Sequence, residues 1–453
     1  MEKIIHFGTD GIRGKADKFP FTHKALICLG KSIAHWSSEK YGNNQKVFLA
    51  NDTRISCENI KHFLKIGFAD YNLKCIDGGV LPTPAVLQII THDKSFDFGI
   101  VISASHNPYT DNGIKLFDGK SGKLNEIDEK EITNLFSTYF KDPSLENTNY
   151  IQQKKPTLNS ILYSCPEQQK KYCQTIISKF QTNFLKGITV ALDCANGATY
   201  DVAPQIFKSL GAEVTTISNK PNGKNINYNC GALHPQNLKN TILKIKADIG
   251  FAFDGDGDRV IAINNKGEIR DGDDILAELS NHPQLKEKNT VVGTIMTNHG
   301  FAKHLEQKGK KLLRTPVGDK HVSAKLEEEK LLLGGESSGH IIIKNYLNSG
   351  DGIFAALKML ESIKESGNWE LNTFQKFPQI LINVPISKKD DLSKKCYANI
   401  IESKKQELEN GRIIVRFSGT ENILRVMTED QDRNLAQNAA ECLAKELSQA
   451  LDT

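Results

Sequence analysis

The residues with the clearest chemistry lie in short polar runs that follow apolar stretches. Ser105 belongs to the run Ser-Ala-Ser-His-Asn-Pro at 103–108, which follows the apolar residues 98–102, and Lys115 comes shortly after it. A serine at the end of a buried strand can act as a nucleophile or carry a phosphoryl group, because backbone N–H groups, His106 and Lys115 are available to an anion. The alternative is an ordinary turn, since Ser, Asn and Pro are common turn residues. The serine run alone favours that turn.

Carboxylates alternate with glycines in a second run. The sequence Asp-Gly-Asp-Gly-Asp at 254–258 follows the apolar residues 249–253, and Arg259 comes next. Carboxylates placed so closely repel one another unless a cation lies among them, and a hard divalent ion suits oxygen ligands. An EF-hand is excluded by register, because Arg259 stands where that loop needs glycine and Asn265 where it needs glutamate. A metal next to an arginine in a strand-end loop is typical of phosphoryl chemistry, and a solvated acidic turn is the weaker alternative.

A third run, at 334–340, contains Glu336, Ser338 and His340 between two apolar stretches. If the segment is extended, these alternating side chains project from one side and present donors and acceptors to the hydroxyls of a sugar. A hairpin turn rich in Gly and Ser is an equally good interpretation of this run alone.

Arginines flank a fourth run. Arg416 and Arg425 lie on either side of the Ser-Gly-Thr turn at 418–420, and hydroxyls, exposed backbone N–H groups and guanidinium groups together suit a phosphate. A strand connection with surface arginines is the alternative. The glycine-rich run at 7–14 adds Arg13, which could reach a phosphate or belong to a mobile end.

The elements that must position these runs alternate between strand-like and helical patterns. Strand-like residues 47–50 and 74–77 flank a helical pattern at 56–73, and similar units begin again at 189 and 290, which predicts βαβ units with mainly parallel sheets. The last block, from about residue 380, predicts a small α+β domain. With 453 residues and polar or irregular stretches as boundaries, we expect four domains, at 1–155, 156–266, 267–376 and 377–453.

Composition excludes several classes of protein. Hydrophobic residues at 39%, charged residues at 25% and a formal charge of +4 indicate a soluble globular protein and argue against nucleic-acid binding. No apolar run approaches the ~20 residues of a membrane span, and the N-terminus lacks a signal-peptide core, so we expect a cytoplasmic protein. The nine cysteines are scattered without a Cys-x-x-Cys pair, which favours reduced thiols over disulfides or zinc.

Taken together and in order, the runs at 7–14, 103–115, 254–259, 334–340 and 416–425 resemble those of the α-D-phosphohexomutase family. The resemblance extends from Phe7 to the C-terminal helical pattern. It implies four domains around a central cleft, the first three α/β and the last a TATA-binding-protein-like α+β domain.

The resemblance also implies roles for individual residues. Ser105 would carry the phosphoryl group as phosphoserine, and one Mg²⁺ per chain would be bound by that phosphoserine with Asp254, Asp256 and Asp258. Charge at the transferring phosphate would be neutralised by Arg13, Lys115 and Arg259, with Lys115 or His106 as the base. The sugar would be bound by Glu336, Ser338 and His340. The phosphate that is not transferred would be held by Arg416, Ser418, Gly419, Thr420 and Arg425.

The implied reaction interconverts a hexose 6-phosphate and its 1-phosphate through a phosphoserine enzyme and a 1,6-bisphosphate, with glucosamine or glucose 1,6-bisphosphate as activator. The Arg-x-Ser-Gly-Thr-Glu form of the loop and the run at 7–14 favour glucosamine phosphates, which supply UDP-N-acetylglucosamine and cell-wall precursors. Glucose or mannose phosphates are the nearest alternatives, and a serine phosphatase or an inactive sugar-phosphate-binding protein are weaker ones. Phe417 and Asn422 replace prolines common in the family, which bears on the rigidity of the loop. The sequence leaves a homodimer open.

Overall fold

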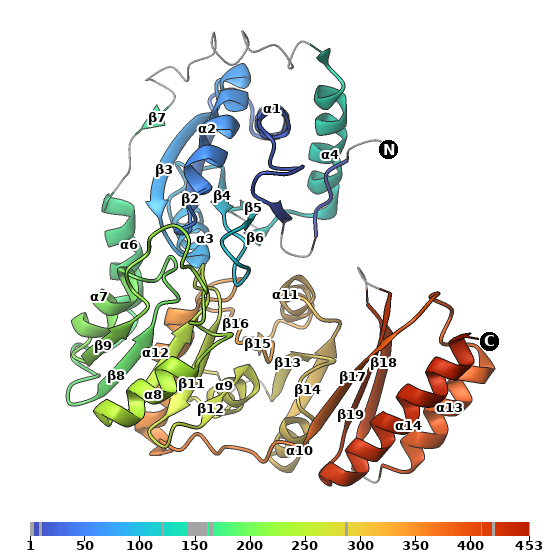
Figure 1. Ribbon diagram of the computed structural model, residues 1–453. Coiled ribbons are helices and arrows are strands. Elements are labelled where there is room, and N and C mark those ends of the chain that lie inside the picture. Colours follow the sequence, from blue (N-terminus) through green and yellow to red (C-terminus); the bar gives the residue numbers. More distant parts are fainter. Residues whose placement is uncertain are drawn as a thin grey trace.

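A computed structural model describes residues 4–8, 11–119, 122–143, 161–162, 166–285, 289–408, 410–418 and 422–452. Four sheets with flanking helices divide the chain into four units, called I to IV in chain order (Figure 1). Units I to III form a larger body, and unit IV lies beside unit III. None of the helices in the described ranges is both long and apolar enough to cross a membrane.

Unit I is a mixed sheet covered by helices on both faces. Its strand order is β1 (Ile12–Lys15), β5 (Asp111–Asp118), β4 (Phe98–Ile102), β2 (Lys46–Asn51), β3 (Lys74–Val80) and β7 (Ile161–Leu162), with β6 (Gly122–Lys123) paired to β5. Strands β4, β2, β3 and β7 are parallel. Its helices are α1 (His23–Tyr41), α2 (Cys57–Phe68), the 3-10 turn η1 (Ala69–Tyr71), α3 (Thr83–His92) and α4 (Glu126–Phe140).

Alternation along the strands explains this two-sided packing. Val47 and Leu49 of β2 face α1, α2 and α4, whereas Phe48 and Ala50 face α3. The start of α4 is fixed locally, because the Asn125 side chain accepts hydrogen bonds from the N–H groups of residues 127 and 128.

Unit II carries a sheet of five strands. The order is β12 (Ile269–Arg270), β11 (Val260–Asn264), β10 (Ile249–Phe253), β8 (Thr189–Asp193) and β9 (Glu213–Ile217), of which β10, β8 and β9 are parallel. Its helices are α6 (Pro166–Ile177), α7 (Val202–Ser209) and α8 (Gln236–Ile245). Because β12 pairs with β11, this sheet extends to Arg270.

Unit III repeats the α/β arrangement with a smaller sheet. The order is β14 (Lys311–Thr315), β13 (Thr290–Thr294), β15 (Leu333–Gly335) and β16 (Ile341–Ile343), with only β16 antiparallel to its neighbour. Its helices are α9 (Gly272–Leu279), α10 (His299–Gln307), α11 (Asp319–Glu328) and α12 (Gly352–Ser366).

Unit IV is an antiparallel α+β unit. Its sheet has the order β17 (Gln379–Pro385), β19 (Ile423–Glu429) and β18 (Arg412–Phe417), and its helices are α13 (Lys395–Gln406) and α14 (Arg433–Asp452). Figure 1 shows both helices on one side of the three strands. The sequence-based prediction of α/β units followed by a small α+β unit is confirmed.

The hydrophobic cores do not follow the units one to one. A single cluster of buried side chains runs from Phe48 and Val101 of unit I through Phe251 of unit II to Phe301 and Leu357 of unit III. Helix α12 contributes to this continuity, because it lies against β10 and β11 as well as β16. Unit IV has its own core, built from residues that include Val384, Tyr397, Leu424, Val426, Leu443 and Leu447.

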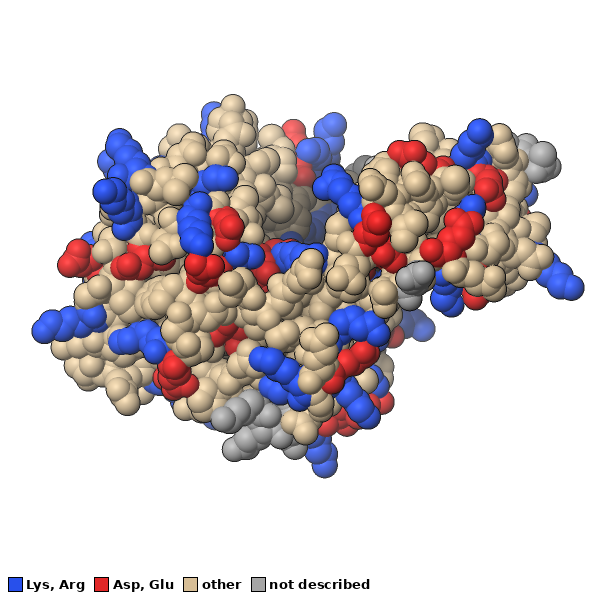
Figure 2. All heavy atoms as spheres, turned by 90° about the horizontal axis from the view of Figure 1, so that it is seen from below, with Lys and Arg blue, Asp and Glu red and all other residues tan. Residues whose placement is uncertain are grey.

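Polar contacts join unit IV to unit III. Arg412 donates hydrogen bonds to the carbonyl oxygens of Ile295 (2.5 Å) and Thr297 (2.6 Å) and forms an ion pair with Glu429. The Glu429 carboxylate also accepts a hydrogen bond from the N–H of His299 at 2.7 Å. Figure 2 shows a recess between the larger body and this smaller lobe, and acidic and basic side chains are interspersed over the face in view.

Candidate active site

Ser105 lies just after β4, in a loop that the structure buries. Its side chain is 0% exposed, and its Oγ donates a hydrogen bond to Asp254 Oδ2 at 2.6 Å. The Nδ1 atom of His106 lies 3.2 Å from the same oxygen. The φ angle of Ser105 is +53°, in the left-handed region that serine seldom adopts. Such strain persists only where the surrounding structure fixes it, and it directs the hydroxyl toward the aspartate loop.

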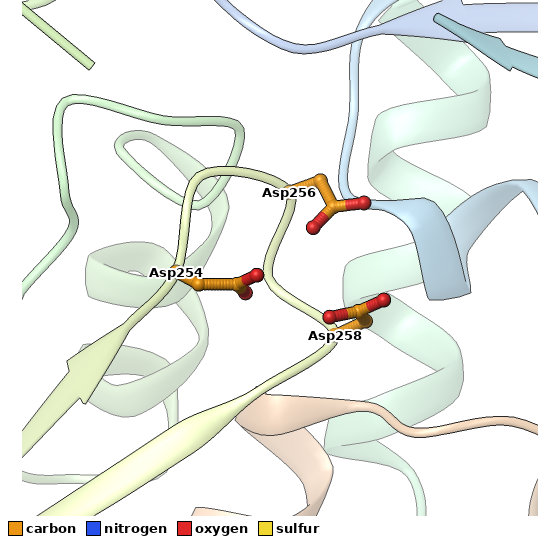
Figure 3. Close-up of side chains that lie close together, drawn as sticks. All are labelled: Asp254, Asp256 and Asp258. Carbon is orange, nitrogen blue, oxygen red and sulfur yellow. The ribbon is translucent and has the colours of Figure 1, made fainter. Parts of the chain in front are cut away.

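The three predicted aspartates surround one point in the loop between β10 and β11. Figure 3 shows their carboxylates turned toward a common space, and ligand atoms of the three lie within 4.8 Å of one another. Lys115 Nζ contacts Asp256 at 2.8 Å and Asp258 at 3.3 Å, and Thr83 donates to Asp256 at 2.5 Å. Lys115 and Ser105 therefore meet the aspartates at one place, as the sequence analysis expected.

The pKa values of Asp254 and Asp258 are shifted by burial and by the charges around them. Burial, Asp258 and Asp256 raise the pKa of Asp254 well above its usual range. Burial also raises the pKa of Asp258, but Lys115, His340 and Arg259 together hold it well below that range. The Oδ1 atoms of Asp256 and Asp258 are buried and meet no hydrogen-bond donor among the described residues. A divalent cation would satisfy both oxygens, so this donor set fits a hard metal ion.

A cavity of about 460 Å³ lies beside Ser105 and the aspartates. Three of the four units contribute to its lining, which consists of His6, Phe7, Gly8, Gly11, Arg13, His106, Asp258, Arg259, Val317, Gly318, Asp319, Glu336 and His340. Burial, together with Arg259 and Arg13, lowers the pKa of His106 to about 4. The cavity therefore brings together residues from four of the predicted runs.

The run at 334–340 adopts the second of the two forms considered from the sequence. It is the hairpin turn between β15 and β16, in which Glu336 N–H donates to the His340 carbonyl at 3.0 Å and Gly339 has φ +91°. A glycine at this left-handed position lets the chain reverse between the two strands. Glu336 and His340 still line the cavity, whereas Ser338 is not among the described residues that do.

The carboxylates on this side of the cavity are held by specific partners. Glu336 Oε1 accepts a hydrogen bond from the N–H of Gly318 at 2.9 Å. His340 lies between Asp258 and Asp319, at 3.7 Å and 3.6 Å. Asp319 also forms an ion pair with Lys123 of unit I at 2.5 Å, which joins units I and III at the cavity.

The arginine run lies on unit IV, apart from this cavity. Arg416 and Arg425 are directly opposite each other on β18 and β19, and burial together with Arg425 lowers the pKa of Arg416. Two adjacent cations repel unless an anion binds between them. Lys389 Nζ donates to the carbonyl of Ser418 at 2.6 Å and adds a third cation. Gly419 and Thr420 lie outside the described residues. In Figure 1 this end of the two strands is the upper one, on the side that faces unit I.

Sequence reasoning missed a group of residues beneath the serine loop. Asp52 and Arg54 follow β2, and Arg54 and Asn227 donate hydrogen bonds to the carbonyl of Ser105. The sequence did contain a signal for Asp52 and Arg54. They belong to the polar run Asn-Asp-Thr-Arg at 51–54, at the end of β2, and β2 is parallel and adjacent to β4, which precedes the serine run. Asn227 lies in an irregular polar segment that gave no comparable signal.

Comparison with protein-family models gives four matches along the chain. The models describe phosphoglucomutase/phosphomannomutase alpha/beta/alpha domain I at residues 5–142, domain II at 170–267, domain III at 271–378 and the C-terminal domain at 381–446. Together the four models cover most of the chain, and they follow one another in the order of units I to IV.

Similar proteins match over nearly the whole length. The phosphoglucosamine mutases of Campylobacter jejuni and Bdellovibrio bacteriovorus are each 39% identical, with 98% and 99% of this chain and 99% and 100% of the relative covered. Among solved structures, the N-acetylphosphoglucosamine mutase of Aspergillus fumigatus in complex with GlcNAc-6P and magnesium has a TM-score of 0.70 at 19% identity, covering 99% of this chain and 96% of that one. That likeness establishes a common fold.

Proposed function

Because this chain belongs to the phosphoglucomutase/phosphomannomutase family, we propose that it interconverts glucosamine 6-phosphate and glucosamine 1-phosphate. The observation that carries the proposal is the contact between Ser105 Oγ and the aspartate loop, in a buried site that opens to a cavity lined by arginines. A buried hydroxyl, a set of carboxylates for a metal ion and surrounding cations are the parts that phosphoryl transfer needs.

The proposed reaction begins with Ser105 as phosphoserine. The bond between phosphorus and Ser105 Oγ breaks as the 1-hydroxyl of glucosamine 6-phosphate bonds to phosphorus, and the hydroxyl proton passes to a base, for which His106 and Lys115 are the candidates. The 1,6-bisphosphate then reorients in the cavity and returns its 6-phosphate to Ser105, which leaves glucosamine 1-phosphate. Arg13 and Arg259 neutralise charge on the transferring group.

Asp254, Asp256 and Asp258 would hold Mg²⁺ together with the phosphoserine. When bound, the ion stabilises the charge on the transferring oxygens. The orphaned carboxylate oxygens support this assignment, and EDTA treatment followed by addition of Mg²⁺ tests it. Activity that persists after complete metal removal would contradict it.

Two carboxylates of the cavity support the preference for an amino sugar. Asp319 and Glu336 line the same cavity as Arg13 and Arg259. The C2 ammonium of glucosamine is a positive group that glucose and mannose phosphates lack. We expect Asp319→Asn to lower kcat/KM for glucosamine 6-phosphate about tenfold more than for glucose 6-phosphate, since one charge-assisted contact is lost. An equal loss for both sugars would contradict this part of the proposal.

The arginine run of unit IV would hold the phosphate that is not transferred. One loop would bind the phosphate at either end of the bisphosphate, because a non-transferring phosphate must be held both before and after the bisphosphate reorients. Its residues would be Arg416, Ser418, Gly419, Thr420 and Arg425. A separate unit suits this task, because closure excludes water from the phosphoserine and opening permits reorientation.

Two measurements test the activity itself. The first compares kcat/KM for glucosamine, glucose and mannose phosphates with Mg²⁺ and the matching 1,6-bisphosphate as activator, and glucosamine phosphate should be the best substrate. The second is Ser105→Ala, which should abolish turnover while the fold is retained, and should remove the phosphorylated species from the intact mass spectrum. Stoichiometric release of inorganic phosphate would instead indicate a phosphatase, and wild-type turnover by Ser105→Ala would exclude the phosphoserine mechanism.

The proposed partners are small sugar phosphates. The sequence leaves a homodimer open, and sedimentation of the purified protein measures the oligomeric state.

A further inference from the structure

A buried ion pair lies beneath the serine loop and takes no part in the reaction just described. Asp52 and Arg54 follow β2, and neither side chain is exposed. Arg54 Nε donates to Asp52 Oδ2 at 2.8 Å, and the backbone N–H of Arg54 donates to Asp52 Oδ1 at 2.9 Å. The charges are thus paired, and the guanidinium has four N–H donors left for other groups.

The serine loop supplies acceptors for all four of these donors. Nη2 of Arg54 donates to the carbonyl oxygens of Ser105 at 2.9 Å and Asn107 at 2.8 Å. Nη1 donates to the carbonyl of Asp111 at 3.0 Å and to that of Pro108. One planar guanidinium therefore binds four carbonyl groups between residues 105 and 111.

The same pair also holds the start of the loop. Asp52 Oδ2 accepts a hydrogen bond from Ser103 Oγ at 2.6 Å, and Ser103 Oγ in turn accepts one from the N–H of Ser105 at 2.9 Å. Both sides of the Ser105 residue, its N–H and its carbonyl, are thus tied to the ion pair.

Unit II reinforces this arrangement from the other side. Asn227 Nδ2 donates to the carbonyl oxygens of Ser105 at 2.8 Å and Asn107 at 3.1 Å, which are the two that Arg54 Nη2 contacts. The orientation of the Ser105 peptide is therefore determined jointly by the units that carry the nucleophile and the aspartates.

We propose that Arg54, oriented by Asp52, is a positioning residue that holds Ser105 in its left-handed conformation and so aims Oγ at the aspartate loop and the transferring phosphate. The inference rests on the proposed phosphoserine reaction. The φ angle of +53° at Ser105 is unfavourable for serine, and a freed peptide would relax to a common conformation that moves the hydroxyl. Lysine cannot replace Arg54, because its ammonium has three donors and lacks the planar fork that reaches four carbonyl groups.

A purely structural role for Arg54 makes a different prediction. If the role were purely structural, substitution of Arg54 would lower the midpoint temperature of unfolding and leave kcat and KM of the folded enzyme unchanged. A positioning role lowers kcat and leaves KM unchanged, since Arg54 is not among the described residues that line the cavity.

The experiment compares Arg54→Lys with a matched control, Lys61→Met. Lys61 is another buried cation of unit I, paired with Asp77 and away from the serine loop. For Arg54→Lys we expect kcat for glucosamine 6-phosphate to fall about 100-fold with KM within about threefold of wild type, because a shift of roughly 1 Å in a reacting group has this effect. The control should lose thermal stability and keep kcat within about twofold.

Asn227→Ala provides a second variant if Arg54→Lys does not fold. It removes one donor from each of two carbonyl groups, and we expect kcat to fall about tenfold with KM unchanged. Hydrogen–deuterium exchange of the amides at 103–113 gives a readout that needs no substrate, and exchange should rise in both variants and not in Lys61→Met.

Unchanged kcat in folded Arg54→Lys or Asn227→Ala, or a loss of kcat in Lys61→Met that parallels its loss of stability, would overturn the inference. A wild-type enzyme without turnover would refute the proposed function instead. Unchanged exchange at 103–113 in the folded variants would then still overturn the positioning role.

Discussion

Gly255 lies where the aspartate loop and the serine loop come closest. A Cβ added at this position would meet the carbonyl oxygen of Ser105 at 2.5 Å and Asn227 Nδ2 at 2.8 Å. Its φ angle is not in the left-handed region, so alanine would fit the backbone. Gly255→Ala therefore leaves the backbone angles allowed and pushes the added Cβ against the Ser105 carbonyl and the side chains of Asn227 and Ile226.

The size of the effect follows from that geometry. Ordinary contacts of a Cβ begin at 3.4 Å, so the loops must separate by roughly 0.9 Å. The atom that must give way is a backbone oxygen that Arg54 and Asn227 already hold, and the movement is passed to Ser105 Oγ. A displacement of this size at a reacting group costs about 100-fold in kcat, or about 2.7 kcal/mol in the barrier.

Steady-state kinetics with glucosamine 6-phosphate, Mg²⁺ and the 1,6-bisphosphate measure the effect. Gly309→Ala is the control, since it forces alanine to φ +68° in a place with no atom within 4 Å of the added Cβ. The control should lose about 1 kcal/mol of stability to strain and keep its kcat. A Gly255→Ala enzyme that folds and retains kcat within about threefold of wild type would refute the reasoning.

Three further predictions concern the metal, the phosphate and a buried carboxyl. Asp256→Asn should raise the Mg²⁺ concentration needed for half-maximal activity roughly tenfold, because a charged ligand is lost; an unchanged titration would rule the site out. Arg416→Ala should lower kcat/KM by about 10- to 100-fold through loss of a charged hydrogen bond to phosphate, while metal activation stays as in wild type. Burial raises the pKa of Asp351 to about 6, so the stability it contributes is fully present below about pH 4 and is lost as pH rises through 6. The loss amounts to about 3 kcal/mol. Asp351→Asn keeps the helix cap and should flatten this part of the dependence of urea unfolding on pH, and an identical profile would contradict the assignment.

Local patterns predicted most of the fold. The apolar runs at 98–102, 189–193 and 249–253 are strands with those bounds, because each is buried on both faces and bounded by polar or turn residues. Helix ends were less well predicted. The helix expected over 56–73 covers Cys57–Phe68 and is followed by the 3-10 turn Ala69–Tyr71. Asn72, with a left-handed φ of +53°, ends that turn, although the apolar pattern continues to the buried Leu73.

The part of the site that was predicted from the sequence is the part in which the residue types themselves indicate the chemistry. Ser105, Lys115 and the aspartates lie together, as the ordered set of polar runs after apolar strands indicated, although the serine run alone favoured an ordinary turn. The sequence left an extended form and a hairpin open for 334–340, and the structure shows the hairpin, in which Gly339 takes a left-handed φ of +91°. Arg54 follows a strand adjacent to that of the serine run, which places it at the same sheet edge. The contacts of Arg54 and Asn227 were still missed, because no sequence pattern shows which backbone carbonyl a distant side chain reaches.

The separate core of unit IV determines how this molecule can move. Separating units I to III from one another would expose to water the apolar side chains of their common core. A rotation of unit IV leaves both this core and the core of unit IV intact. Its attachment to unit III includes the hydrogen bonds of Arg412 and Glu429, which are polar contacts that water can replace, each at a net cost of about 1.5–3 kcal/mol. Movement of unit IV and unfolding of the body formed by units I to III are therefore separate events, with separate free energies. An enzyme built this way can be made more heat-resistant in its body without slowing the swing of its fourth unit.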